Sequence, residues 1–422
     1  MNVLDLRGPG PDHERWHQLC ARSAGLEGPA DDAAREVIAA VRERGDAAVA
    51  ELTLRFEGRD LGRFELTPGE RAAAIEAIPS DLRAALQLAA DNIRRFHTTQ
   101  LPRDTGLHSD DTHLVTRARP LARVAVYAPG GTAAYPSSVL MTAIPAKVAG
   151  VAEVLLFTPR PSEVVLLAAE LAGVDRVFAI GGAQAIAAAA LGTGQVPRVD
   201  KIVGPGNAYV TAAKRQVFGL VDIDGIAGPS EVLILADHTA DPELIAADLL
   251  AQAEHDVLAC PIAVTSDPEL IAAIRRALGE QLETLPRRDI AARALADHGA
   301  LVLVADRDAM VTAANAYAPE HLELLVHDPR SLVDRLHTAG AIFVGPFTPE
   351  AAGDYTAGPS HVLPTAGAAR FASPLGVWDF IKHTSILELS APALRAQADA
   401  IVRIARAEGL EAHARAALLR LR

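Results

Sequence analysis

Histidine side chains lie beside carboxylates in the second half of the chain. Glu320 and His321 are adjacent and follow a proline at the predicted start of a strand. An imidazole titrates near neutral pH and a carboxylate accepts protons, so the pair has the groups that general acid–base catalysis needs. One residue could accept a proton from a substrate and the other could activate a water molecule.

A helix in the middle of the chain could present metal ligands. Gln252 and His255 lie three residues apart on a predicted helix, which places both side chains on one face. Four more residues with suitable donors follow in the sequence: Asp354, His361, Glu408 and His413. Imidazole and carboxylate suit zinc, but the HExxH and Cys-rich patterns are absent. Spacing alone therefore leaves open whether these residues bind a metal or only support the fold.

Two potential nucleophiles lack the context that hydrolases give them. Cys260 begins an apolar predicted strand with no nearby His or Asn signature, so a buried, inert thiol is favoured. Ser230 precedes a strand but does not lie in a GxSxG turn, which favours a turn or binding hydroxyl. Serine or cysteine hydrolase chemistry is not predicted.

Glycine-rich turns follow several predicted strands. They are the segments 128–131, 181–182 and 204–207. Each puts small residues where a helix begins, so backbone N–H groups could approach a phosphate. None is a GxGxxG or a P-loop, and each alone could serve only close packing of strand on helix. Because the carboxyl ends of parallel strands share one sheet edge, three such turns favour a nucleotide or another anionic ligand there.

The elements that must position these residues change in kind along the chain. Residues 1–120 are predicted to be mostly helical, with helices over 31–53, 68–78 and 80–97. From residue 123, short β-branched runs alternate with Ala-rich helical segments, which is typical of parallel α/β sheets. The predicted strands are 123–127, 152–158, 176–180, 200–203, 231–236, 261–265, 300–304, 321–326 and 340–344. They are too many for one ordinary sheet, so we expect two α/β domains.

Composition excludes several classes of function. The 422 residues are 50% apolar and 22% charged, and the net charge of −13 disfavours nucleic acid and anionic membranes as partners. Two cysteines cannot form a disulfide framework, and the first residues show no signal peptide, so we expect a cytoplasmic protein. The uncharged stretches 124–146 and 177–197 are broken by Gly, Pro and polar residues. We therefore expect no membrane span.

Long motifs carry a resemblance to one family. They are YAPGGTAAYPSSVLMTAIPAKVAGV (127–151), GGAQAIAA (181–188), KIVGPGNAYVTAAKRQVFG (201–219), GIAGPSEVLILAD (225–237), QAEHD (252–256), YAPEHLEL (317–324), GDYTAGPSHVLPT (353–365) and GLEAHARA (409–416). In this order they resemble the histidinol dehydrogenase family from about residue 120 to the end.

The resemblance implies a fold and its division. The expected fold is a pair of interleaved, incomplete Rossmann-like α/β domains with parallel sheets, plus small helical segments at both ends. Residues 24–126 and 232–374 would form the first domain, with the metal and catalytic residues, and 127–231 the NAD-binding domain. Residues 1–23 would be an N-terminal helical segment, and 375–422 would reach the partner subunit.

The resemblance also implies an activity, which is the oxidation of L-histidinol to L-histidine by two molecules of NAD. His321 would accept the hydroxyl proton, and Glu320 would activate water for the second step. The implied zinc ligands are Gln252, His255, Asp354 and His413, and the implied NAD contacts are Tyr127, Gln184 and Asn207. The substrate would touch the zinc ligands, His321, Ser230, Glu408 and His361. Glu408 and His413 would come from the other subunit of a homodimer.

Other functions stay open at this point. A relative could oxidise a different polar alcohol through changes around the imidazole pocket. A metal-dependent binding protein without turnover would be free to lose the Glu320–His321 pair, which this chain retains. A zinc hydrolase would need no nucleotide.

Overall fold

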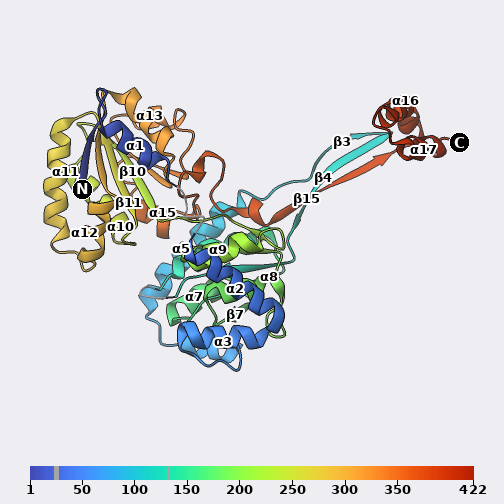
Figure 1. Ribbon diagram of the computed structural model, residues 1–422, viewed down its shortest axis with the longest axis horizontal. Helices are drawn as coiled ribbons and strands as arrows, with labels where there is room; N and C mark the ends of the chain where they lie inside the picture. The colour runs from blue at the N-terminus through green and yellow to red at the C-terminus, as the bar shows by residue number, and fades with distance from the viewer. Residues whose placement is uncertain (23–27, 131–133) are drawn as a thin grey trace.

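The computed structural model describes residues 1–22, 28–130 and 134–422, and consists of two lobes and a narrow arm (Figure 1). Each lobe contains a six-stranded sheet, and the arm is a three-stranded sheet. We call the lobe containing β1 lobe A and the lobe containing β5 lobe B. The predicted boundary between residues 23 and 24, and residues 131–133 of the first glycine-rich motif, lie outside the described residues.

Lobe A is a parallel sheet in the order β1-β12-β11-β10-β13-β14. Its strands are β1 (Asn2–Asp5), β10 (Glu231–Ala236), β11 (Cys260–Thr265), β12 (Ala300–Leu303), β13 (His321–Leu325) and β14 (Ala341–Val344). One apolar core joins the sheet to α10 (Pro242–Ala253), α11 (Pro268–Leu282) and α12 (Arg288–Asp297). The other joins it to α1 (Asp12–Cys20), α13 (Arg307–Tyr317) and α14 (Arg330–Val333). α15 (Glu350–Tyr355) follows the last strand.

Lobe B is a sheet in the order β2-β7-β6-β5-β8-β9, in which only β2 is antiparallel to its neighbour. Its strands are β2 (Glu65–Leu66), β5 (Arg123–Tyr127), β6 (Glu153–Phe157), β7 (Arg176–Phe178), β8 (Lys201–Val203) and β9 (Asp222–Ile223). One face is covered by α2 (Pro29–Arg44), α3 (Asp46–Glu57), α8 (Gly182–Leu191) and α9 (Ala208–Val217). The other is covered by α4 (Pro68–Ile75), α5 (Ser80–Thr98), α6 (Pro136–Ala149) and α7 (Glu163–Ala172).

The strand order confirms the expected fold class. Numbered along the chain, the five parallel strands β5–β9 of lobe B and the five strands β10–β14 of lobe A both have the order 3-2-1-4-5. This is the order of a Rossmann sheet without its sixth strand. Each predicted strand is present, because strands buried on both faces appear in the sequence as continuous apolar runs.

The division of the chain differs from the predicted one. Residues 29–98 pack on lobe B and not on the lobe that contains residues 232–344, because the apolar faces of α2 to α5 belong to the two cores of lobe B. The N-terminal segment is not only helical, since β1 pairs in parallel with β12 at the edge of lobe A. Residues 375–380 also return to lobe B, where Leu375, Val377 and Phe380 join its core.

The arm was not predicted as a sheet. Its strands are β3 (Thr105–Ser109), β4 (Thr112–Pro120) and β15 (Ile381–Leu389), all antiparallel. They are exposed on both sides and rich in Thr, His and Arg, so they lack the apolar runs that indicate strands. The arm projects from the lobes and carries α16 (Ala391–Ala407), α17 (Glu411–Leu419) and the C-terminus at its tip (Figure 1).

Among the described residues, no helix combines the length and the apolar character that crossing a bilayer requires.

Candidate active site

The predicted catalytic residues lie at the amino edge of the sheet of lobe A. β10 begins at Glu231 and β13 begins at His321, and these two strands are neighbours in the sheet. A turn with Ala318 in the left-handed region (φ 54°) brings the chain from α13 into Glu320. The predicted catalytic pair therefore lies at the start of β13, next to the start of β10, where the strand order of the sheet reverses.

His321 is held as a neutral base. Its Nδ1 lies 3.0 Å from the carbonyl oxygen of Glu231, an acceptor, so Nδ1 carries the proton and donates. Its buried Nε2 has no hydrogen-bond partner among the described residues and lies 3.8 Å from Oδ1 of Asp354. Burial lowers the pKa of His321 to about 4, although the charge of Asp354 opposes this shift. The imidazole therefore has an unprotonated nitrogen available at neutral pH.

Glu320 is buried beside it. Its Oε2 accepts a hydrogen bond of 2.8 Å from the backbone N–H of Glu231 and lies 3.7 Å from Nδ1 of His321. Burial raises the pKa of Glu320 well above its usual range, and the charges of Glu231 and Asp354 add to this, whereas the Glu231 N–H lowers it. A raised pKa makes the carboxylate a stronger base toward water.

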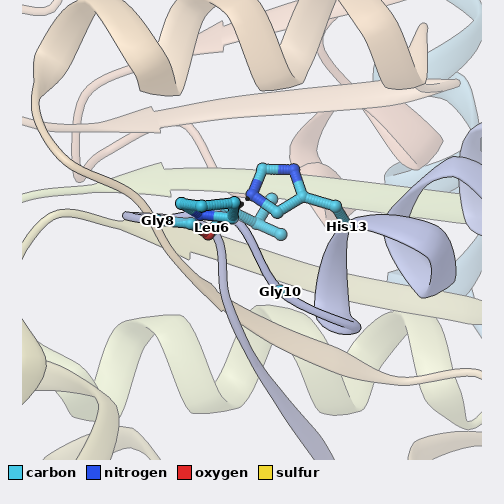
Figure 2. A pocket seen from close by; sticks show the side chains of 5 residues that line it. Leu6, Gly8, Gly10 and His13 are labelled. Carbon is cyan, nitrogen blue, oxygen red and sulfur yellow. Dashed lines mark hydrogen bonds between the residues drawn. The ribbon is translucent and has the colours of Figure 1, made fainter.

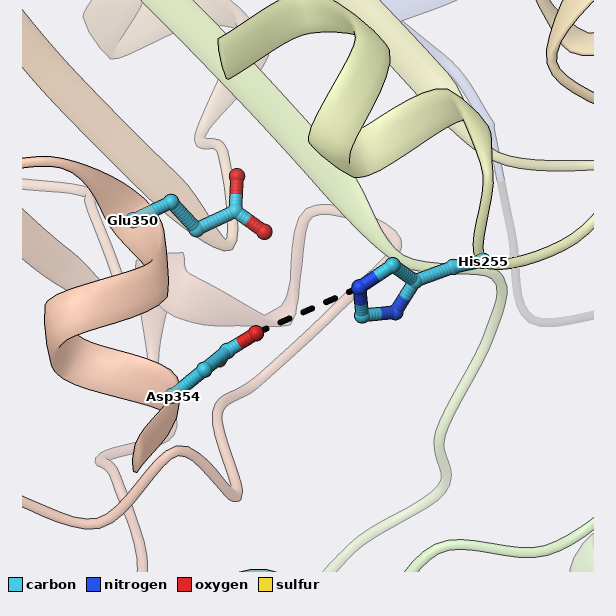
Figure 3. Close-up of side chains that lie close together, drawn as sticks. All are labelled: His255, Glu350 and Asp354. Carbon is cyan, nitrogen blue, oxygen red and sulfur yellow. Dashed lines mark ion pairs between the residues drawn. The ribbon is translucent and has the colours of Figure 1, made fainter. Parts of the chain in front are cut away.

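Three side chains beside this pair form a candidate metal centre. His255, Glu350 and Asp354 point toward one another (Figure 3), and their ligand atoms all lie within 4.8 Å of one another. His255 Nε2 is 4.0 Å from Oδ2 of Asp354. Nitrogen and oxygen donors of this kind, one imidazole with two carboxylates, suit zinc. His255 comes from the loop after α10, whereas both carboxylates come from α15.

Gln252 and His361 border this cluster. The Gln252 side chain is fully buried, and its amide nitrogen donates to Oε1 of Glu350 (3.1 Å) and to the carbonyl oxygen of Glu231 (3.3 Å). His361 Nδ1 lies 3.1 Å from the carbonyl oxygen of Asp354, and burial lowers its pKa. The structure thus brings Gln252, His255, Asp354 and His361 together around the catalytic pair. Ser230 immediately precedes Glu231 at the same edge.

Glu350 was not predicted from the sequence as a residue of the site. It is buried within 3.9 Å of Nδ1 of His321, and burial raises its pKa well above the usual range. Its spacing was an available signal, since Glu350 and Asp354 are four residues apart and so lie on one face of a helix.

The remaining predicted metal ligand lies elsewhere in the same chain. Glu408 directly follows α16 and His413 lies in α17, and both are exposed; these helices lie at the tip of the arm (Figure 1). The structure of one chain does not bring them to the cluster of Figure 3.

The predicted NAD contacts lie at the carboxyl edge of lobe B. Tyr127 ends β5, and its hydroxyl accepts a hydrogen bond of 3.1 Å from the N–H of Gly182 at the start of α8. Burial raises the pKa of Tyr127 to about 12. Gln184, which is buried, donates to Glu57 (3.3 Å), a residue that sequence reasoning missed. Asn207 caps α9 and is exposed.

A separate hollow lies at the opposite edge of lobe A. Its volume is about 490 Å³, and Leu6, Gly8, Pro9, Gly10 and His13 line it (Figure 2). His13 Nε2 bonds within the loop, at 3.0 Å from the Gly8 carbonyl oxygen. The hollow follows the carboxyl end of β1 and contains none of the predicted site residues.

The chain resembles known proteins over nearly its whole length. The family model described as histidinol dehydrogenase matches residues 21–421. The chain belongs to the histidinol dehydrogenase family. The histidinol dehydrogenase of Syntrophotalea carbinolica is 54% identical over 400 residues, which cover 93% of each chain. That of Moorella thermoacetica is 53% identical over 395 residues, 92% of this chain and 93% of the relative.

A solved structure extends the likeness to the whole fold. The crystal structure of the histidinol dehydrogenase from Elizabethkingia anophelis matches with a TM-score of 0.94 at 34% sequence identity. The match covers 100% of this chain and 98% of that chain, so it includes both lobes and the arm. As a member of the histidinol dehydrogenase family, the protein is an oxidoreductase.

Proposed function

We propose that this protein is a zinc-dependent, NAD-linked dehydrogenase of the cytoplasm that oxidises L-histidinol to L-histidine through an enzyme-held aldehyde. This reaction forms the last two steps of histidine biosynthesis. The observation that carries the proposal is the unpartnered Nε2 of His321, a buried neutral base beside both Glu320 and the His255–Glu350–Asp354 cluster.

His321 performs the first proton transfer. Because its Nδ1 donates to the Glu231 carbonyl oxygen, the basic nitrogen is Nε2, which takes the hydroxyl proton of the alcohol as hydride leaves the same carbon. The hydrogen bond to the backbone fixes the ring orientation and the tautomer together. His321 thereby becomes an imidazolium, whose charge the neighbouring carboxylates stabilise.

Glu320 acts in the second oxidation. Its carboxylate accepts a proton from water, and the resulting hydroxide adds to the aldehyde carbon to form the anion of the hydrate. This anion loses its one remaining C–H hydrogen as hydride, which leaves the carboxylic acid. The backbone N–H of Glu231 holds one carboxylate oxygen, so the other can face the water.

Zinc and NAD supply the chemistry that side chains lack. When bound, zinc would hold the imidazole and amine of the substrate, and the nicotinamide would accept the hydrides. We assign the zinc ligands as Gln252, His255, Asp354 and His413, with Ser230, Glu408 and His361 as further substrate contacts. Tyr127, Gln184 and Asn207 are the proposed NAD contacts. Tyr127 ends β5 and Asn207 follows β8, the two strands between which the strand order of lobe B reverses, and this position supports the assignment.

The active unit in this proposal is a homodimer in which the arm supplies Glu408 and His413 to the partner's lobe A. Their exposure at the tip of the arm supports this arrangement. Leu107, Leu114 and Leu387 are register partners across the arm and so share one face. Leu107 is 72% and Leu387 73% exposed, which is the apolar character expected of an interface.

The test is a titration of purified protein with L-histidinol and excess NAD, followed by the absorbance of reduced nicotinamide. We expect two equivalents of reduced cofactor and one of L-histidine per histidinol, with activity lost to a chelator and regained with zinc. Other polar alcohols serve as the comparison panel. One equivalent per alcohol, or equal turnover of an alcohol without an imidazole, contradicts the proposal.

A further inference from the structure

A buried ion pair lies directly behind the catalytic residues. The guanidinium of Arg22 meets the carboxylate of Glu231 with two bonds, Nε to Oε1 and Nη2 to Oε2, both 2.5 Å. The side chains are 14% and 2% exposed. The N–H of Ala366 also donates to Glu231 Oε1 at 3.0 Å. Such a two-bond fork fixes the direction of both side chains, which a single contact does not.

The backbone of Glu231 touches three residues of the site. Its N–H donates to Glu320, its carbonyl accepts from His321 Nδ1, and the same carbonyl accepts from the amide of Gln252. The backbone of one residue therefore orients the proposed water-activating carboxylate, fixes the tautomer of the base and positions a proposed zinc ligand. These contacts come from main-chain atoms, so they depend on where the backbone of Glu231 lies. The paired side chain of Glu231 fixes that position.

Arg22 also holds the second strand of the pair. It donates to the carbonyl oxygens of Tyr317 (2.7 Å) and Ala318 (3.3 Å), and its guanidinium stacks over the Tyr317 ring at 3.4 Å. These carbonyls lie two to three residues before Glu320. A single side chain from the N-terminal segment thus connects the start of β10 with the chain that enters β13.

We propose that Arg22 is a positioning residue, which sets the relative place of Glu320 and His321 by clamping the Glu231 carboxylate and the 317–318 turn. The inference rests on the proposed function. Without the guanidinium, the Glu231 carboxylate stays buried without a charged partner. The start of β10 then shifts to solvate this carboxylate. The shift moves the Glu231 backbone away from Glu320 and His321. Arg22 itself bonds none of the proposed substrate, zinc or NAD contacts, so we expect the main effect on turnover.

The test compares R22M, R22K and the double variant R22M/E231Q with Arg7→Met as the matched control. Arg7 lies in the same N-terminal segment and pairs with Asp5, but that pair is exposed. We expect R22M to lose about 100-fold in kcat, with KM for histidinol and bound zinc close to wild type. R22K, which keeps the charge but not the fork, should recover part of the loss.

The double variant separates positioning from folding. It removes the unpaired buried charge, so it should fold like wild type by circular dichroism and thermal melting while kcat stays at least 10-fold low. Oxidation of supplied histidinaldehyde should fall as well, because the backbone of Glu231 contacts both Glu320 and His321. Wild-type kcat in R22M or in the folded double variant overturns the inference, as does a loss accounted for by missing zinc or unfolded protein. Failure of wild type to reduce NAD would instead refute the proposed function.

Discussion

At the scale of single residues, the backbone of one peptide decides which nitrogen of His321 is basic. Nδ1 donates to Glu231, so the proton acceptor is Nε2, and burial lowers the pKa to about 4, which keeps the ring neutral. The same burial raises the pKa values of the nearby carboxyl groups of Glu320 and Glu350. The buried environment therefore places an unprotonated imidazole beside two carboxyl groups that bind protons more tightly than usual.

Replacing the base tests this assignment. His321→Asn keeps a side-chain N–H that can donate to the Glu231 carbonyl but removes the basic nitrogen. We expect histidinol oxidation to fall by about 100- to 10,000-fold with zinc content unchanged. Oxidation of supplied histidinaldehyde should fall less, because Glu320 remains. The matched control is His327→Asn at an exposed histidine just after the same strand, which should retain full activity. Equal loss in both half-reactions would argue against a base dedicated to the alcohol.

A buried carboxyl behind the site should make stability depend on pH. Burial raises the pKa of Glu323 well above its usual value, and the charge of Asp248 adds to this. The folded state therefore binds the proton more tightly than the unfolded state. Stability from this group is complete below the unfolded pKa and falls as pH rises toward the folded pKa.

Glu323→Gln removes the ionisable group and with it the loss of stability at high pH. The glutamine side-chain oxygen can still accept from the Glu350 N–H, as Oε1 of Glu323 does at 3.0 Å in the native protein. We expect the free energy of unfolding of the variant to exceed that of wild type by about 1 to 2 kcal/mol at pH 8 and to be equal or lower at pH 4. Urea titrations at both pH values measure the difference. A gain of the same size at both would mean that ionisation is not its cause.

At the scale of elements, the proposed NAD contacts and the proposed catalytic residues lie at opposite edges of their respective sheets. Lobe B presents the carboxyl ends of β5 and β8, and lobe A presents the amino ends of β10 and β13. At the lobe B edge, Gly204 approaches Tyr127 so closely that a Cβ would lie 2.1 Å from the Tyr127 carbonyl oxygen, and its φ is +116°. The turn that leads to Asn207 therefore needs glycine for space and for conformation.

Gly204→Ala should separate crowding from backbone strain when compared with Gly219→Ala. Gly219 has a φ of +97° but nothing within 4 Å of its Cβ position. In both variants the positive φ costs the alanine about 1 kcal/mol or more of conformational free energy. Only Gly204→Ala must also displace the end of β5. We expect a higher Kd for NAD in Gly204→Ala alone, measured by calorimetry. Equal Kd values in the two variants would remove Tyr127 and Asn207 from the cofactor site.

The sequence predicts these elements unevenly. Strands buried on both faces, such as 231–236 and 321–326, appear as apolar runs, whereas the exposed strands of the arm do not. Motifs predict Glu320, His321 and the proposed metal ligands of lobe A, because the proposed roles of those residues depend on their own side chains. Arg22 and Glu231 act through a pairing between positions 209 residues apart, which no local pattern reveals. The assignment of residues 29–98 to lobe B likewise depends on tertiary packing.

At the scale of the whole molecule, the arm separates one proposed zinc ligand, His413, and one proposed substrate contact, Glu408, from the other side chains of the site. Its own core is small, consisting of Val402, Ala405 and Ala414. Donation across a dimer predicts complementation between defective chains. A dimer of Asp354→Ala with His413→Ala contains one site with both defects and one site with neither.

Mixing these two inactive variants by joint refolding or coexpression should restore about a quarter of wild-type activity, because half the dimers are mixed and each has one intact site. Mixing Asp354→Ala with His255→Ala, both in lobe A, should restore nothing. Steady-state reduction of NAD at equal protein concentration measures both mixtures. Absence of recovery in the first mixture, with mixed dimers verified by mass, would place His413 in its own chain's site.

The pairing of β1 with β12 also bears on how the chain is made. Asn2–Asp5 join Ala300–Leu303, so the first strand to leave the ribosome finds its neighbour only after nearly 300 further residues have been translated. The sheet of lobe B and the helices on its two faces, which run from residue 29 to residue 223, have by then been synthesised. Vectorial synthesis thus favours forming the sheet of lobe B before lobe A closes, when the N-terminal strand pairs with β12 and Arg22 pairs with Glu231.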